Sequence, residues 1–137
     1  MSDPKKVASF EEIERADDIQ YDYVEAYGKT VRVGSLNSDD MIEWMEERED
    51  KEKKRTAGLR LVVRSLVDDQ GNRIPKDQRE GWITLLGSKD AKSNARVFVV
   101  ALKLNGLSAK GVDYLKNASG EATTVASPSG SPLPPAT

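Results

Sequence analysis

The chain has 137 residues, of which 21 are basic and 23 acidic, and its formal net charge is −2. This length suits a single domain, and a balanced charge without a basic surplus argues against a nucleic-acid-binding protein. Because the sequence contains neither cysteine nor histidine, it excludes disulfides, thiolate nucleophiles and cysteine-ligated zinc, and it lacks the commonest general base.

The N-terminal segment has no sign of a targeting signal. The opening MSDPKKVASF lacks the apolar stretch of a signal peptide, and no later run approaches the roughly 18 apolar residues of a membrane span. We therefore expect a cytoplasmic protein with no membrane partner. Residues 1–8 are expected to be disordered. Ser9 should begin a short helix, because Glu12 completes a capping box with it, and Phe10 and Ile13 share one face of that helix.

A β-hairpin is predicted at about residues 22–34. Two runs with strand propensity flank Gly28 and Lys29, and residues 30–33 alternate between polar and apolar as a half-buried strand does. Two strands alone are marginally stable in water. The hairpin must therefore pack on helices or pair with another chain.

A long helix is predicted at about residues 38–56, with Ser38 as its N-cap and an apolar patch around Trp44. Its second half, EEREDKEKKR, contains only charged residues, and acids and bases four residues apart, such as Glu47 and Lys51, favour one another on a helix. The basic residues could mark a nucleic-acid or calmodulin-like patch. The interspersed acids favour a solvated helical extension instead.

The next predicted helix, at about residues 57–67, belongs to the core. Leu59, Val62 and Val63 begin an apolar stripe at helical spacing, and Arg60 and Arg64 are expected to mark the solvent-exposed side. The following DDQGN reads as a turn. It cannot be an EF-hand loop, because no glutamate occupies the twelfth position of that loop.

Two further helices are predicted at about residues 76–86 and 89–105. Gly87 ends the first and Ser88 can cap the second. Residues 97–100 have strand propensity, but the apolar run is long for a strand and Asn105-Gly106 suits a left-handed helix end. One face should contain Ala95, Phe98, Val99 and Leu102. Because only Arg96 and Lys103 interrupt the apolar surface, this helix is expected to be buried nearly all round, in the core or against another subunit.

The last predicted helix, residues 108–117, is short. Ser108 is its candidate N-cap, Leu107 and Val112 form a hydrophobic staple, and Tyr114 and Leu115 add an apolar edge. Residues 118–137 hold four of the six prolines and a single charge, which predicts a flexible tail. The fold class is therefore mainly α with a small N-terminal β-hairpin (α+β), as one compact helical domain at residues 9–117.

No motif indicates catalysis or a cofactor. Neither a P-loop nor a GxGxxG sequence is present. Paired acids such as Asp39-Asp40 and Asp68-Asp69 occur where helix caps and turns favour them, so a catalytic dyad is a poor interpretation. We expect a protein that is not an enzyme and binds no cofactor or metal.

Three segments, in the same order, resemble a protein family. They are FEEIERADDIQYDYVEAYGKTVRVGSL, LRLVVRSLVDDQGNRI and VVALKLNGLSAKGVDYLKN, and LNGLS followed by a Ser/Pro-rich tail is the most specific part. Over about residues 9–117 the chain resembles a tail assembly chaperone of long-tailed bacteriophages, in its short, non-frameshifted form. The segment RIPKDQREGW departs from the usual aromatic and acidic continuation of the family.

The resemblance implies a non-enzymatic role in the host cytoplasm. Such chaperones bind the tape measure protein, keep it soluble and help tail tube protein polymerise around it, and they are absent from the mature virion. Many have a longer form made by ribosomal frameshifting, which is a further expected partner; Lys116-Asn117 permits slippery codons. A homo-oligomer is also expected. Two alternatives remain: a structural minor tail or connector protein of the virion, and a non-phage adaptor protein.

The tape measure contact is predicted at Leu107, Val112, Tyr114 and Leu115, because their apolar edge has no obvious partner within the chain. Replacing Tyr114→Ala together with Leu115→Ala should therefore lower the amount of tape measure protein that co-purifies with the chaperone. Unchanged co-purification would show that this segment is not the contact.

Overall fold

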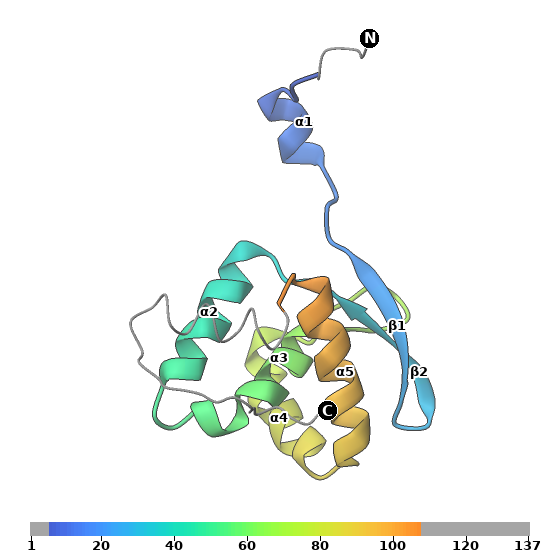
Figure 1. Ribbon diagram of the computed structural model, residues 1–137, viewed down its shortest axis with the longest axis vertical. Coiled ribbons are helices and arrows are strands. Elements are labelled where there is room, and N and C mark those ends of the chain that lie inside the picture. The colour runs from blue at the N-terminus through green and yellow to red at the C-terminus, as the bar shows by residue number, and fades with distance from the viewer. Residues whose placement is uncertain (1–5, 108–137) are drawn as a thin grey trace.

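The structure is a computed structural model that describes residues 6–107, and these contain five α-helices and a small antiparallel sheet of order β1-β2-β3, on which α5 packs (Figure 1). The α+β prediction is thus confirmed, whereas the predicted helix 108–117 and tail lie outside the described residues. The elements are α1 Phe10–Arg15, β1 Tyr21–Ala26, β2 Lys29–Gly34, α2 Ser38–Glu49, η1 Lys54–Thr56, α3 Ala57–Ser65, β3 Leu66–Val67, η2 Lys76–Gln78, α4 Arg79–Gly87 and α5 Ala91–Leu104.

The first helix, α1, stands apart from the rest of the fold, joined to it by an extended segment (Figure 1). Its predicted capping box is confirmed: the Ser9 amide donates to Glu12 Oε1 at 2.8 Å and the Glu12 amide donates to Ser9 Oγ at 3.1 Å. Phe10 and Ile13 share a face as expected, but that face is 89% and 60% exposed. The helix is therefore well started but has no packing partner in this chain.

The predicted hairpin is present, and it gains a third strand. The turn lies one residue earlier than the predicted Gly28-Lys29. Tyr27 and Gly28, with φ of 58° and 73°, form it, as the right-handed twist of a hairpin favours. The helix predicted to continue to residue 67 ends at Ser65, and Leu66 and Val67 pair with β2 as β3. Pairing satisfies backbone groups of β2 that would otherwise be left open at the sheet edge. Periodicity alone could not reveal this switch.

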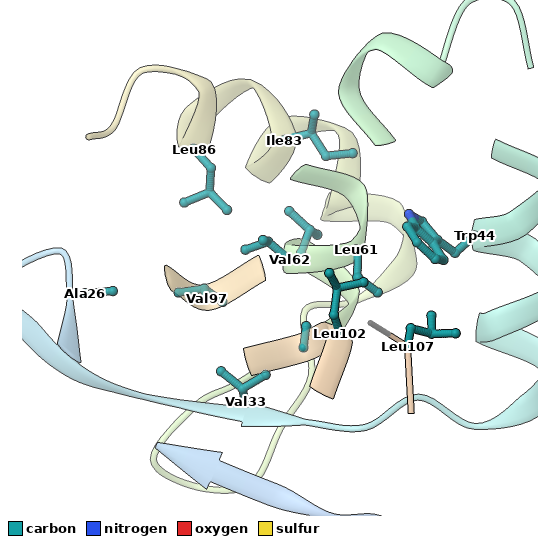
Figure 2. Close-up of a cluster of buried hydrophobic side chains, with 12 residues drawn as sticks. Ala26, Val33, Trp44, Leu61, Val62, Ile83, Leu86, Val97, Leu102 and Leu107 are labelled. Atoms are coloured by element: carbon teal, nitrogen blue, oxygen red, sulfur yellow. The ribbon is translucent and has the colours of Figure 1, made fainter. Parts of the chain in front are cut away.

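The hydrophobic core surrounds α3, which packs on α2, α4 and α5 (Figure 2). Its middle residues Leu61, Val62 and Val63 are fully buried. Trp44 of α2 packs against them and donates its indole N–H to the Ala57 carbonyl at 2.8 Å. The buried core consists of Ala26, Val33, Trp44, Leu61, Val62, Val63, Ile83, Leu86, Val97, Ala101, Leu102 and Leu107.

The buried face of α5 differs from the predicted one. Ser93, Val97 and Ala101, spaced four residues apart, face the interior, whereas Ala95 and Val99 are exposed. Small side chains on the inner face let α5 lie close to β1 and β2. Within residues 6–107 of this chain α5 is therefore not buried nearly all round, and its burial against another subunit stays a prediction. Its N-cap is also not Ser88, because the Asp90 carboxylate accepts from the Ser93 amide.

The helix α2 is shorter than predicted. Its N-cap is Asn37 rather than Ser38, and it ends at Glu49 instead of continuing to residue 56. The Asp50 carboxylate accepts from the amides of Glu52 and Lys53 at 2.8 and 3.1 Å, and a side chain that satisfies its own backbone in this way ends a helix. The charged pairs predicted four residues apart along 47–54 therefore lose their helical register.

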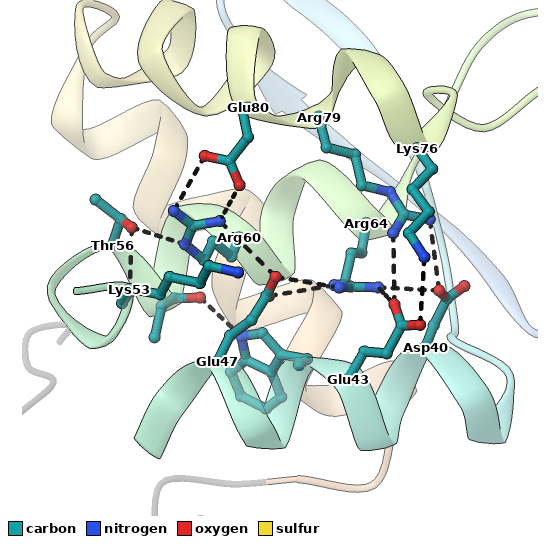
Figure 3. A network of polar contacts seen from close by, with 12 residues as sticks. Asp40, Glu43, Glu47, Lys53, Thr56, Arg60, Arg64, Lys76, Arg79 and Glu80 are labelled. Atoms are coloured by element: carbon teal, nitrogen blue, oxygen red, sulfur yellow. Dashed lines mark hydrogen bonds and ion pairs between the residues drawn. The ribbon is translucent and has the colours of Figure 1, made fainter. Parts of the chain in front are cut away.

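The largest correction concerns Arg60 and Arg64, which are 7% and 6% exposed and not on a solvent-exposed side. Both guanidinium groups lie between α2 and α4 (Figure 3). Arg64 contacts Asp40, Glu43 and Glu47 at 2.9, 3.1 and 3.2 Å, and Arg60 contacts Glu80 at 2.6 Å. The carboxylates of α2 fall on one helical face, and that face meets α3. A single sequence does not show that these two faces meet.

The ion pairs of Arg60 and Arg64 shift the pKa values of the network in the directions that favour its charged forms. Burial disfavours the charged form of Arg64, but hydrogen bonds and charges from Glu47 and Glu43 outweigh it and raise the pKa of Arg64. The hydrogen bond from Arg64, followed by the charge of Lys76, lowers the pKa of Glu43. The hydrogen bond from Arg60 lowers the pKa of Glu80. The three helices α2, α3 and α4 are thus tied together by charges that remain ionised.

Replacing Arg64→Met should lower the free energy of unfolding by about 3 kcal/mol, because three carboxylates then lose their shared cation. We place the loss at the lower end for a broken buried pair because Asp40 and Glu43 are partly exposed. Urea denaturation measures it. The matched control is Arg15→Met, whose exposed pair with Glu11 should contribute less than about 1 kcal/mol. Equal losses in both variants would contradict a structural role for the buried network.

Stability should also fall in acid. A carboxyl group with a lowered pKa in the folded protein stabilises the fold above its unfolded pKa, and this stability is lost as the pH falls through the folded value. For Glu43 and Glu80 the loss should therefore begin as the pH falls below their ordinary value of 4.5. Urea midpoints measured across this range should depend less on pH when both residues are replaced by glutamine. An unchanged dependence would assign acid sensitivity to other groups.

Candidate partner-binding groove

An apolar groove of about 610 Å³ lies between α4 and the β2–β3 side of the sheet. Helix α5 packs on β1 and β2, and α4 packs on α3, so the space between α4 and β3 is left open. Most of its lining is hydrophobic, and binding sites for apolar segments of partner proteins commonly have this character. The apolar lining consists of Tyr27, Val31, Leu66, Val67, Ile74, Pro75, Trp82, Leu85 and Leu86.

One wall of the groove is a stripe along α4. Trp82 and Leu85 lie three residues apart on one side of α4, and Gln78 and Lys89, which also line the groove, flank the two ends of this helix. Trp82 and Leu85 remain exposed, while Ile83 and Leu86 turn toward the core. The apolar surface of α4 is therefore wider than the core requires, and the excess faces the groove.

The opposite wall is held rigidly at the tip of the hairpin. Tyr27 has a left-handed backbone conformation that non-glycine residues seldom adopt. Its amide donates to Ser93 Oγ at 2.9 Å and its hydroxyl donates to Asn94 Oδ1 at 2.6 Å, so α5 holds it in place. Burial raises the pKa of the Tyr27 hydroxyl, which stays neutral. These contacts fix the ring beside the groove.

The turn at residues 68–75 closes the end of the groove that precedes α4. Asp68 accepts hydrogen bonds from the amides of Gln70 and Asn72, and these bonds lower the pKa of its carboxyl group. Arg73 donates to the carbonyls of Ser35 and Arg64 at 2.6 and 2.9 Å. Burial lowers the pKa of Arg73. The turn is thus tied to β2 and α3, and the groove is formed before any partner binds.

Charge is unevenly placed around the groove. Lys89, just beyond the C-terminal end of α4, makes no ion pair among the described residues. The carboxylate of Asp68, by contrast, is engaged by its own turn. Lys89 can therefore receive an acidic group from a bound segment.

The residues predicted from sequence as the partner contact are not brought together here. Leu107 is only 8% exposed and belongs to the core, beside Trp44 (Figure 2). The left-handed Gly106 turns the chain back, and the Leu107 amide donates to the Leu102 carbonyl at 2.7 Å. The assumption that Leu107 lacks an intrachain partner is thus wrong. Val112, Tyr114 and Leu115 lie outside the described residues, and their role stays a prediction.

The sequence of α4 indicated an excess of apolar residues, but their spacing did not show which of them face the groove. Trp82, Ile83, Leu85 and Leu86 cover more than one face of a short helix, so some of them must point away from the core. Which ones do so depends on where α3 lies. Only the assembled fold assigns Trp82 and Leu85 to the open side.

No protein-family model, curated protein or solved structure matches this chain. Within residues 6–107, no helix is long and apolar enough to cross a membrane. The same part of the chain contains no cluster of three or more acidic side chains arranged to hold a metal ion.

Proposed function

We propose that this protein is a non-catalytic tail assembly chaperone of a long-tailed bacteriophage, which binds the tape measure protein and keeps it soluble. The preformed apolar groove is the observation that supports this proposal most strongly, together with the resemblance at LNGLS. In this proposal the chaperone acts in the host cytoplasm, helps tail tube protein polymerise around the tape measure, and leaves before the virion is complete.

The groove suits an amphipathic helix of the tape measure protein. Such helices bind apolar grooves through side chains one turn apart, at intervals of three or four residues. Trp82 and Leu85 offer two contact points at this spacing, and the ring of Tyr27 provides a rigid surface opposite them. A long, coiled client exposes many such helical segments. One groove per chaperone would therefore allow many copies to cover it.

The polar groups beside the groove support binding rather than chemistry. The hydroxyl of Tyr27 is bonded to Asn94, the carboxylate of Asp68 to backbone amides, and Arg73 to backbone carbonyls. Because these polar groups already form hydrogen bonds within the protein, they hold the walls of the groove in place. Lys89 is left to recognise charge.

Replacing Leu85→Asp should abolish this binding, because it places a charge in the apolar stripe of α4. The measurement is the amount of soluble tape measure protein that co-purifies when both proteins are co-expressed, and we expect a decrease of at least about tenfold, the effect of losing roughly 1.4 kcal/mol of binding free energy. Leu85 is 42% exposed, so the fold should tolerate the change. The control is Val99→Asp on α5, which is 41% exposed and lies outside the groove.

Equal capture by both variants would contradict the groove as the client site. The alternative of a structural minor tail or connector protein predicts a different observation, since such a protein would be found by mass spectrometry in purified virions. A chaperone should be missing from them, and a long tape measure gene should lie immediately downstream of its own gene.

A further inference from the structure

The helix α1 has apolar surface that nothing in residues 6–107 covers. Val7, Phe10 and Ile13 are 87%, 89% and 60% exposed, and the helix projects from the body of the protein (Figure 1). An isolated helix of six residues is not stable in water by its own hydrogen bonds, even with a capping box. Such a helix becomes stable when its apolar face packs on another surface.

The groove described above offers a surface of matching size and spacing. Phe10 and Ile13 lie one turn apart on α1, and Trp82 and Leu85 lie one turn apart on α4, so two side chains of each helix can meet those of the other. The groove's 610 Å³ is large enough for an aromatic and an aliphatic side chain together. Both surfaces are otherwise uncovered in the described residues.

Charge favours the same pairing. The helix α1 contains Glu11, Glu12 and Glu14 against a single base, Arg15. Lys6 precedes the helix, and two further acids, Asp17 and Asp18, follow it. Lys89 beside the groove has no ion-pair partner among the described residues. Docking α1 would therefore bring an acidic helix to an unpaired cation.

The path of the chain carries α1 away from the body of the protein (Figure 1). After Arg15 the backbone becomes extended at Ala16, and residues 16–20 contain neither glycine nor proline to reverse its direction. This segment joins β1, which forms the edge of the sheet opposite β3, and the groove lies on the β3 side. The arm thus leaves the protein from the edge that is farther from its own groove.

We propose that α1 of one copy docks in the groove of a second copy, so that each chain gives one arm and receives another. Reciprocal exchange of arms would give a closed pair, whereas an arm passed on to a further copy would build a ring or an open chain of subunits. The contact is small, so association should be weak, on the order of 10–100 µM. If the groove also binds the tape measure, as the proposed function holds, the arm protects the apolar stripe until a client displaces it.

Sedimentation velocity of the full chain tests the arm contact. The concentrations should run from about 5 to 500 µM, so that they span the expected dissociation constant. The wild type should shift to larger species as the concentration rises. An arm variant, Phe10→Asp with Ile13→Asp, and a groove variant, Leu85→Asp, should each remain monomeric. The control Val99→Asp should associate like the wild type. Circular dichroism verifies folding, and Leu85→Ser replaces Leu85→Asp if the latter unfolds.

The decisive sample is an equimolar mixture of the two variants. The arm variant still has an intact groove and the groove variant still has an intact arm, so together they should form a species of two chains and nothing larger. A monomeric wild type, an arm variant that associates like the wild type, or a mixture that stays monomeric would each overturn the proposal. A wild type that stays monomeric because its arm covers its own groove would also overturn the proposal.

Client capture separates this inference from the proposed function. The arm variant should capture tape measure protein at least as well as the wild type, because its groove is open, whereas the groove variant should lose capture. If the variants form the two-chain species but Leu85→Asp captures the tape measure normally, the arm contact stands and the groove is not the client site. An arm variant that loses capture would show that α1 contacts the client, and that result would overturn its role as a competitor.

Discussion

The buried guanidinium groups of Arg60 and Arg64 fix how α2 and α4 lie on α3. Charges taken out of water must be matched closely, because each unpaired ion is costly in the interior. Carboxylates from α2 and α4 meet this requirement where both helices lie against α3. The wall of the groove is part of α4, so its position depends on this network. The apolar wall of the groove is thus held in place by an electrostatic contact on the other side of its helix.

The groove combines a rigid frame with an apolar surface that no other described residue covers. Tyr27 is held by α5, and Arg73 ties the turn to β2 and α3, so the frame needs no rearrangement to accept a helix. Preorganisation lowers the entropy lost on binding, which favours recognition of short segments that bind weakly one at a time. A client with many similar helices would gain affinity from the number of such contacts rather than from the strength of any one of them.

Local features of this fold could be predicted from sequence, and features that depend on neighbouring elements could not. The capping box at Ser9, the presence of the hairpin and the left-handed Gly106 follow from side chains within a few residues of one another. The burial of Arg60 and Arg64 depends on carboxylates of other helices. The inner face of α5 depends on how closely the sheet approaches. The groove is also a feature that depends on neighbouring elements. Trp82 and Leu85 are exposed and Ile83 and Leu86 are buried because of the side of α4 on which α3 lies.

The burial of Leu107 has a consequence for whatever follows it in the chain. Its side chain lies in the core and its amide ends α5, so the last described residue is anchored to the body. Sequence attached beyond it therefore starts from a fixed point. Two chains that were identical up to Leu107 and differed only after it would share the contacts that hold this body together. A change of sequence beyond Leu107 would then alter what is attached to the groove-bearing unit and leave these contacts in place.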